Sequence, residues 1–192
     1  MNALGFDISS GDGVIDWQLA ASHGIEWATI RATWGVDGLD LNYNANFNAA
    51  LSVGIKPISY AWFVPRVDAI AQAHWFTTHA LPSELGWMID LEDSGWRYKA
   101  YHGIWAEIKK WMNATGARKQ YTSPDYIGRY LYDCPEINQY EILLANWDLG
   151  APRYIRPLET TRWWAWQMTG KAPAPYYGIT QCHDCSLYVM ND

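Results

Sequence analysis

Acidic side chains stand within or beside apolar segments at positions that could share one site. They are Asp7, Asp90, Glu92 and Asp184. Asp90 and Glu92 are two positions apart, so a β-strand would direct both side chains to the same face. Two carboxyl groups held that close in a partly dry cleft raise the pKa of at least one, which can then donate a proton near neutral pH. Each acid alone could cap a turn or pair with a base, but the four together indicate acid–base chemistry.

That chemistry suits the cleavage of a glycosidic bond. A carboxylic acid protonates the leaving oxygen, while nearby carboxylates stabilise the oxocarbenium-like transition state. Aromatic and amide side chains at or near the ends of neighbouring apolar segments could stack on sugar rings and bond their hydroxyl and acetamido groups. The candidates for this binding role are Tyr60, Trp62, Tyr121, Trp147, Trp164, Trp166 and Gln167. No step of this chemistry requires a metal, and no cofactor is predicted.

The composition favours a carbohydrate ligand over a nucleic acid. The 192 residues include 13 tryptophans and 13 tyrosines but only 4 phenylalanines, so most aromatic rings carry a polar group. Such rings suit the faces of sugars, although many of them will simply fill the core. The formal net charge is −6, and no run of Lys or Arg is longer than a pair such as 109–110. Nucleic acid is therefore not an expected partner.

The acids and aromatics need elements to position them, and the chain alternates strand-like and helical segments. Strands are expected at 4–8, 27–31, 56–63, 86–92, 119–122, 141–145, 163–167 and 184–189. Helices are expected to begin after the capping residues Asp16, Asn44 and Asp68. A fourth helix, with apolar residues three or four positions apart between 101 and 112, should end at Gly116.

These segments predict an α/β fold, a barrel of parallel strands that becomes irregular toward its C-terminal half. Eight strands fit, but helices are clear only in the first half, so fewer than eight helices are expected. The alternative is a doubly wound sheet, but residues 9–13 contain neither G-x-G-x-x-G nor a following lysine. The length fits a single domain over residues 1–192. Chemistry in such a barrel gathers at the C-terminal ends of the strands, which is where the acids fall.

The three cysteines do not form a complete disulfide or metal pattern. Cys182 and Cys185 have the C-x-x-C spacing of a metal or redox site, and Cys134 with a histidine could complete a zinc set. No second C-x-x-C or H-x-x-x-H supports that set, however. A redox C-x-x-C opens a helix near the start of a domain, whereas this one lies close to residue 192. We therefore expect ordinary thiols and no bound metal.

The motifs, taken in order, resemble glycoside hydrolase family 25, the lysozymes of the Chalaropsis type, which are N-acetylmuramidases. The matching segments are 5–9, 15–17, 30–35, 60–63, 89–92, 121–123 and 164–167, followed by Asp184. The resemblance implies a flattened, TIM-like (β/α) barrel with Glu92 as the general acid. It also implies that Asp90, Asp7 and Asp184 orient the substrate and stabilise charge, and it adds Arg31 to the residues that bind substrate.

By the same resemblance, the reaction would be hydrolysis of the β-1,4 bond from N-acetylmuramic acid to N-acetylglucosamine in bacterial peptidoglycan, with retention of configuration. The sequence leaves open whether a protein carboxylate or the substrate's own acetamido group is the nucleophile. Two places depart from the family pattern. Cys185 and Ser186 stand where the family has an apolar residue and Asn, and Trp147 stands where it has Tyr.

Two other functions remain open. A non-catalytic barrel could grip glycan without cutting it, although the presence of every expected acid favours an enzyme. A chitinase-like hydrolase would carry acids at two alternate positions before Asp90, where this chain has Gly86 and Met88.

The expected partner is the glycan strand of bacterial peptidoglycan, bound by a monomer. No apolar run approaches the roughly 20 residues that cross a bilayer, so membrane insertion is not expected. Residues 1–5 lack the basic start and apolar centre of a signal peptide. This favours a phage-type enzyme that is cytoplasmic until it is released on host-cell lysis, although an extracellular chain whose leader has been removed would look the same.

Overall fold

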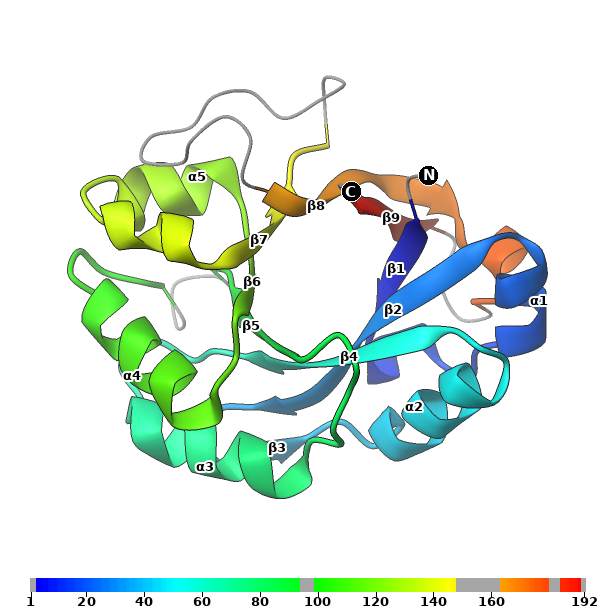
Figure 1. Ribbon diagram of the computed structural model, residues 1–192, viewed down its shortest axis with the longest axis horizontal. Helices are drawn as coiled ribbons and strands as arrows, with labels where there is room; N and C mark the ends of the chain where they lie inside the picture. The colour runs from blue at the N-terminus through cyan, green and yellow to red at the C-terminus, as the bar shows by residue number, and fades with distance from the viewer. Residues whose placement is uncertain (1–2, 94–98, 148–162, 180–183, 191–192) are drawn as a thin grey trace.

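The computed structural model describes residues 3–93, 99–147, 163–179 and 184–190, with the side chains of the last stretch described from Ser186 onward. Within these residues eight strands close into a barrel in the order β1, β9, β8, β7, β6, β5, β4, β2, with β2 returning to β1 (Figure 1). Their bounds are Leu4–Ile8 (β1), Ile25–Trp34 (β2), Lys56–Trp62 (β4), Trp87–Leu91 (β5), Lys119–Thr122 (β6), Glu141–Ala145 (β7), Trp163–Pro173 (β8) and Asp184–Met190 (β9). A two-residue strand, β3 (Gly38–Leu39), pairs with the end of β2 outside this ring. The prediction of an irregular α/β barrel with eight strands and fewer than eight helices is confirmed.

The direction of the last strand differs from the prediction of parallel strands. β1, β2 and β4 to β8 run parallel, but β9 runs antiparallel to both β8 and β1. A parallel β9 would need a long crossover, whereas an antiparallel strand can return directly from the extended β8. Because β9 is reversed, its first residue lies toward the end of the barrel at which the other strands finish. The backbone of Asp184 pairs there with Pro173.

The longer helices lie outside the ring of strands (Figure 1). They are α1 (Trp17–Ser22), α2 (Tyr43–Ser52), α3 (Ala69–His79) and α4 (Trp105–Thr115). Two predicted caps are present, because Asp16 accepts from the Leu19 amide at 2.9 Å and Asp68 from the Ala71 amide at 2.7 Å. Local hydrogen bonding at these acids therefore sets where α1 and α3 begin.

Other helix ends are set by different means. α4 ends as predicted at Gly116, which adopts a left-handed conformation with φ of 74°. The prediction that Asn44 caps α2 is wrong, because that helix already begins at Tyr43. Asp40 instead accepts from the amide of Asn42 at 3.1 Å, just before the helix starts.

Beyond α4, the helical segments are short. α5 (Pro124–Tyr126) follows β6 and runs directly into a π-helical turn over Ile127–Leu131. Ser123 caps α5, with its hydroxyl accepting from the Tyr126 amide at 3.1 Å. The sequence predicts no helix here, because the segment is short and contains Pro124 and Gly128.

Two apolar cores hold the barrel. The larger one lies between the strands and the outer helices. The smaller one fills the barrel and consists of Trp27, Ile58, Tyr60, Met88, Tyr121, Leu143, Ala165 and Tyr188. Gly5 is required there, because a Cβ atom at this position would lie 2.3 Å from the indole of Trp27. Tyr60, Met88, Tyr121 and Tyr188 of this core also line a pocket among the C-terminal ends of the strands.

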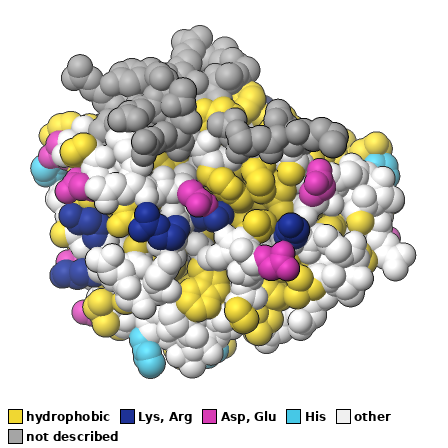
Figure 2. Space-filling view, viewed as in Figure 1, with side chains coloured by type: hydrophobic (Ala, Val, Ile, Leu, Met, Phe, Trp, Pro, Cys, Tyr) yellow, Lys and Arg dark blue, Asp and Glu magenta, His cyan; other side chains and the backbone are white. Residues whose placement is uncertain are grey.

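The described surface mixes both signs of charge. Lys56 lies 3.9 Å from Glu84, and Lys109 lies 3.6 Å from Glu136. On the face shown in Figure 2, basic and acidic side chains likewise lie beside one another, with hydrophobic side chains between them. None of the described helices is long and apolar enough to cross a bilayer.

Candidate active site

A pocket of about 210 Å³ opens among the C-terminal ends of the strands. Its lining is Asp7, Thr29, Arg31, Tyr60, Trp62, Met88, Asp90, Glu92, Tyr121 and Tyr188. Three of the four acids singled out in the sequence therefore share one cavity with a cation and four aromatic rings. The fourth, Asp184, has its backbone in β9, but its side chain is outside the described residues.

Asp90 lies within β5, between Trp62 on β4 and Tyr121 on β6 in the register of the sheet. Its Oδ1 atom is buried and has no hydrogen-bond partner among the described residues. Burial raises the pKa of Asp90 well above its ordinary value, and the negative charges of Glu92 and Asp7 raise it further. A buried acceptor without a partner is suited to accept a hydrogen bond from a ligand.

Asp7 enters the pocket from β1, opposite Thr29 of β2. Burial raises its pKa from 3.8 to about 6, and the negative charges of Asp12 and Glu92 add to this rise. Hydrogen bonding with the Tyr188 hydroxyl is the largest opposing effect. Asp7 therefore changes charge close to neutral pH.

Glu92 follows the last residue of β5 and stands at the mouth of the pocket. The residue as a whole is exposed to solvent, yet the protein around its carboxyl group raises its pKa by desolvation. Hydrogen bonding with the Tyr121 hydroxyl is the opposing effect and lowers that pKa. Of the three acids, Glu92 is thus the one with both a raised proton affinity and open access to a ligand.

Arg31 is the cation of the pocket, and it is held in place from outside. Its Nε atom lies 3.2 Å from Asp40 Oδ2, and the Asp40 side chain is only 1% exposed. The same oxygen accepts from the Ser10 amide at 2.7 Å. Arg31 also lowers the pKa of Asp90 electrostatically. Asp40 thus orients a guanidinium whose charge favours the ionised form of Asp90.

The predicted binding residues divide into three groups. Arg31, Tyr60, Trp62 and Tyr121 line the pocket itself. Gln167 and Trp147 lie beside it, because Gln167 accepts from the Tyr121 hydroxyl and Trp147 donates to Gln167. Trp147 is 54% exposed, and its ring lies over Gly170.

The structure places Trp164 and Trp166 away from this pocket. The Trp164 ring packs 5.2 Å from the ring of Trp27, under the ammonium of Lys119 at 4.7 Å. These contacts lie where the strands start, at the opposite end of the barrel. The Trp166 indole donates to the Asn146 carbonyl at 2.8 Å and is not part of the pocket lining.

A buried amide connects two tyrosines of the pocket. The Tyr121 hydroxyl donates to Gln167 Oε1 at 3.0 Å, and Trp147 Nε1 donates to the same oxygen at 2.6 Å. Gln167 Nε2 donates to the Tyr188 hydroxyl at 2.8 Å. Gln167 itself is only 2% exposed, so little of its surface is available to a sugar.

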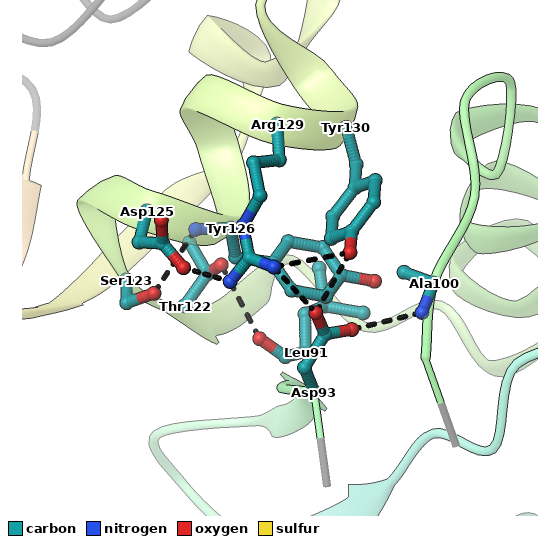
Figure 3. A network of polar contacts seen from close by, with 9 residues as sticks. All are labelled: Leu91, Asp93, Ala100, Thr122, Ser123, Asp125, Tyr126, Arg129 and Tyr130. Carbon is teal, nitrogen blue, oxygen red and sulfur yellow. Dashed lines mark hydrogen bonds and ion pairs between the residues drawn. The ribbon is translucent and has the colours of Figure 1, made fainter. Parts of the chain in front are cut away.

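The end of β5 is anchored by a polar network next to Glu92 (Figure 3). Asp93 Oδ1 accepts from the Ala100 amide at 2.8 Å, and Asp93 Oδ2 accepts from the Tyr130 hydroxyl at 2.7 Å. Arg129 Nη1 lies 3.2 Å from the same Oδ2 atom, and its Nη2 atom pairs with Asp125. The network holds Asp93, the residue that follows Glu92, in place.

Sequence reasoning missed several residues of the site. Thr29, Met88 and Tyr188 line the pocket, and Asp93 anchors its edge. Alternation could have indicated Thr29 and Met88, which precede Arg31 and Asp90 by two positions on their strands. Tyr188 gave no local signal, because only the antiparallel pairing of β9 places it opposite Gln167.

The thiols show no metal pattern in the part of the chain that can be described. Cys134 is a buried free cysteine, Cys182 is outside the described residues, and the same holds for the side chain of Cys185. Among the described side chains, no group of three or more His, Cys, Asp or Glu is arranged to hold a metal ion. The pocket therefore offers protonatable carboxyl groups and aromatic surfaces as its chemistry.

Comparison with known proteins gives a consistent result. The sequence model for glycosyl hydrolases family 25 matches residues 6–176. The chain is 25% identical over 187 residues to Lysozyme M1 of Streptomyces globisporus, covering 87% of this chain and 62% of that protein. It thus spans less than two thirds of the length of that relative.

Solved structures share the fold. A family 25 glycosyl hydrolase from Bacillus anthracis has a TM-score of 0.84 at 20% identity, over 98% of this chain and 88% of the other. A bacterial lysozyme from Streptomyces coelicolor has a TM-score of 0.82 at 20% identity, over 100% of this chain and 93% of the other.

Proposed function

The chain belongs to glycosyl hydrolases family 25, and from that premise we propose that it is a muramidase. The bond it hydrolyses is the β-1,4 bond from N-acetylmuramic acid to N-acetylglucosamine in bacterial peptidoglycan. We propose that residues 1–192 act as one catalytic domain. The observation that carries the proposal is the gathering of Asp7, Asp90 and Glu92 in one pocket, each with a raised pKa.

In this proposal Glu92 is the general acid. Its place at the mouth lets it reach the glycosidic oxygen, and its raised pKa increases the share of molecules in which it can donate a proton. Asp90 and Asp7 stabilise the positive charge that develops on the sugar, and the unpartnered Asp90 Oδ1 orients the substrate. Asp184 shares this role by its likeness to the terminal acid of the family.

The products should retain the configuration of the anomeric carbon. Either a carboxylate attacks that carbon, or the acetamido group of the muramic acid does so while Asp90 holds it. In both routes Glu92, once it has given up its proton, takes one from the incoming water. Each route inverts the carbon twice, and this is why retention is expected.

Tyr60, Trp62 and Tyr121 supply the walls that a sugar ring would contact, and Arg31 supplies a donor to its polar groups. Trp147 could extend this surface, since its exposed ring lies next to Gln167. We do not extend the binding role to Trp164 and Trp166, which pack elsewhere.

The partner we propose is the glycan strand of the bacterial wall, bound by a single copy of the chain and without insertion into the membrane. Peptidoglycan lies outside the cytoplasmic membrane. The enzyme therefore reaches it either after export or after release when the host cell lyses.

Turbidity of isolated bacterial walls tests the activity. The unmodified chain should clear the suspension, and Glu92→Gln should slow clearing by about 10²- to 10⁴-fold, the usual contribution of a general acid. Glu84→Gln is the matched control, because its side chain is 82% exposed and, among the described residues, its ion pair is with Lys56 on the surface. Full clearing by Glu92→Gln would refute the mechanism.

The released fragments test the bond. Mass spectrometry should find reducing ends on muramic acid, and reducing ends on glucosamine would contradict the assignment. If the barrel only binds glycan, the unmodified chain should sediment with walls and release no fragments.

A further inference from the structure

We infer that Arg66 binds a carboxylate of the peptide that branches from the muramic acid, so that the chain recognises this peptide as well as the sugars. The inference rests on the proposed function, because it concerns a second part of the same substrate. In peptidoglycan the peptide is attached to the lactyl group of the muramic acid and carries free carboxylates. Arg66 lies outside the pocket lining, so its role is one of substrate recognition and not of bond cleavage.

The backbone of Arg66 has a conformation that few residues adopt. Its φ is 68°, and among the described residues it is the only one other than glycine with a positive φ. This left-handed conformation costs an arginine free energy, whereas glycine adopts it without a steric penalty. Strain of this kind persists where the surrounding structure enforces it, and it clusters at sites that bind ligands. A binding role for the side chain accounts for an arginine at a position that glycine would occupy without strain.

A buried glutamine enforces the conformation of the loop between β4 and α3, in which Arg66 lies. Gln72 Oε1 accepts from the Val64 amide at 2.9 Å. Gln72 Nε2 donates to the carbonyls of Val64 and Val67 at 3.0 and 3.1 Å. These bonds fix the chain on both sides of Arg66, so the position of its Cα atom is set before any ligand binds.

The guanidinium of Arg66 is supported on one face and open at its edge. It lies 4.8 Å from the centre of the Tyr101 ring, and the residue is exposed to solvent. Among the described residues this guanidinium has no hydrogen-bond or ion-pair partner, whereas every other described arginine bonds to an acceptor of the protein. A guanidinium over an aromatic ring keeps its edge N–H groups available, and these match the two oxygens of a carboxylate.

The ring that supports Arg66 is connected to the end of β5, where Glu92 stands. Tyr101 follows Ala100, whose amide donates to Asp93 Oδ1 at 2.8 Å (Figure 3). Asp93 is the residue directly after Glu92. Arg66 and Tyr101 therefore belong to two loops that adjoin the general acid at the C-terminal end of the barrel. In this proposal the peptide of a muramic acid bound beside Glu92 leaves the pocket over these loops.

The charges around Arg66 suit an anion brought by the substrate. Asp68 is the nearest acid along the chain, but it accepts from the Ala71 amide at 2.7 Å and forms no ion pair with Arg66. Lys99, two residues before Tyr101, is exposed and adds a positive charge to the neighbouring loop. The chain has a formal net charge of −6, so a carboxylate is repelled by the protein as a whole and needs a local cation to bind.

The test compares two soluble glycan fragments that carry uncrosslinked peptides and have the same sugars. In one fragment the peptide carboxylates are free, and in the other they have been converted to amides. Chromatography of the products gives kcat/KM for each fragment. Arg66→Gln should lower the ratio of kcat/KM, free acid over amide, by about 3- to 10-fold, which is the scale of one partly exposed charge-assisted contact.

Two further variants separate recognition from folding. Arg66→Lys keeps the charge but not the planar fork of donors, so its ratio should fall less than that of Arg66→Gln. Arg66→Gly removes the side chain at a position whose φ suits glycine, so it should be at least as stable to heat as Arg66→Gln. Its ratio should nevertheless fall as far as in Arg66→Gln.

Arg118→Gln is the matched control. Arg118 is also exposed, and its guanidinium lies 5.0 Å from the centre of the Tyr140 ring. It stands directly before β6, at the end of the barrel where the strands start. The substitution removes the same charge and the same kind of ring contact, but the ratio should stay that of the unmodified chain.

Equal ratios for Arg66→Gln and the unmodified chain would overturn the inference. An equal fall in Arg66→Gln and Arg118→Gln would overturn it as well, because it would show an effect of net charge alone. If the unmodified chain cleaves neither fragment, the proposed function fails. Calorimetric titration of both fragments into the unmodified chain and into Arg66→Gln then decides whether Arg66 binds the carboxylate.

Discussion

The Tyr130 hydroxyl donates to Asp93 Oδ2 at 2.7 Å and so ties the residue that follows Glu92 to the helical segment after β6. Glu92 is held by the chain on both sides, because Leu91 before it is buried in the sheet. Its carboxyl group can therefore keep one position at the mouth of the pocket. This anchoring predicts that a residue outside the pocket contributes to the rate.

Tyr130→Phe should lower kcat by roughly 3- to 10-fold and destabilise the fold by about 1 kcal/mol, the typical net value of one hydrogen bond. KM should change little, since Tyr130 does not line the pocket. The check is steady-state kinetics together with urea unfolding. Tyr132→Phe is the control, because among the described side chains the Tyr132 hydroxyl has a single 3.4 Å contact, with exposed His102. Equal kinetics for the two variants would show that the anchor does not matter.

Asp7 makes stability depend on pH in a direction opposite to that of most surface acids. Its pKa is about 6 in the folded protein against an ordinary 3.8, so the folded state binds this proton more tightly than the unfolded chain. The stabilisation of the fold by protonated Asp7 is complete below pH 4 and is lost as the pH rises through 6. At about 1.4 kcal/mol per pH unit, the loss is of the order of 3 kcal/mol.

Asp7→Asn should therefore be more stable than the unmodified chain at pH 7.5, by up to about 3 kcal/mol, and nearly equal to it at pH 4. Urea unfolding at a series of pH values measures the difference. Asp37→Asn, at an exposed position, should show no such pH-dependent gain. The variant should also lose most activity, as a site acid would. A constant difference between Asp7→Asn and the unmodified chain at all pH values would contradict the assignment.

Elements with local signals could be predicted from the sequence. β5 is a short apolar run that ends in acids, and the caps Asp16 and Asp68 bond to amides three residues ahead of them. These signals act within a few residues, so neighbouring side chains suffice to place them. The gathering of Asp7, Asp90 and Glu92 then follows from the rule that barrel strands finish at one end.

Features that depend on strand pairing could not be predicted. The reversal of β9 is set by its two neighbours, and it alone brings Tyr188 opposite Gln167. Register shifts between β7 and β8 likewise decide which way the tryptophans of β8 face. This is why Trp164 packs against Trp27 at the far end of the barrel and not at the pocket.

Asp40 is the buried partner that orients Arg31. Asp40→Ala should cost about 3 to 5 kcal/mol, because it leaves the guanidinium without its ion pair and the Ser10 amide without its acceptor. It should also raise KM by several fold, since Arg31 lines the pocket. Thermal unfolding and kinetics below the melting temperature measure the two effects.

Lys110→Met is the comparison for Asp40→Ala. It breaks the 2.7 Å pair with Glu107 on the surface of α4, and a pair exposed to solvent contributes little to stability. Its KM should equal that of the unmodified chain. An Asp40→Ala variant as stable as Lys110→Met would mean that the buried pair does not hold Arg31.

Gly5 allows the first strand to cross the indole of Trp27, and a methyl group has no room there. Gly5→Ala places its Cβ within 2.3 Å of the ring, so the ring or β1 must move. Overpacking of this kind costs about 1 to 3 kcal/mol or more. Because β1 also carries Asp7, activity should fall beyond what the lost stability explains.

Gly128→Ala is the matched substitution, since nothing lies within 4 Å of its Cβ position and it sits in a helical turn. It should be neutral or stabilise by about 0.5 to 1 kcal/mol. Differential scanning calorimetry of both variants decides the matter, and equal melting temperatures would show that the barrel accommodates the methyl group by moving Trp27 at no cost.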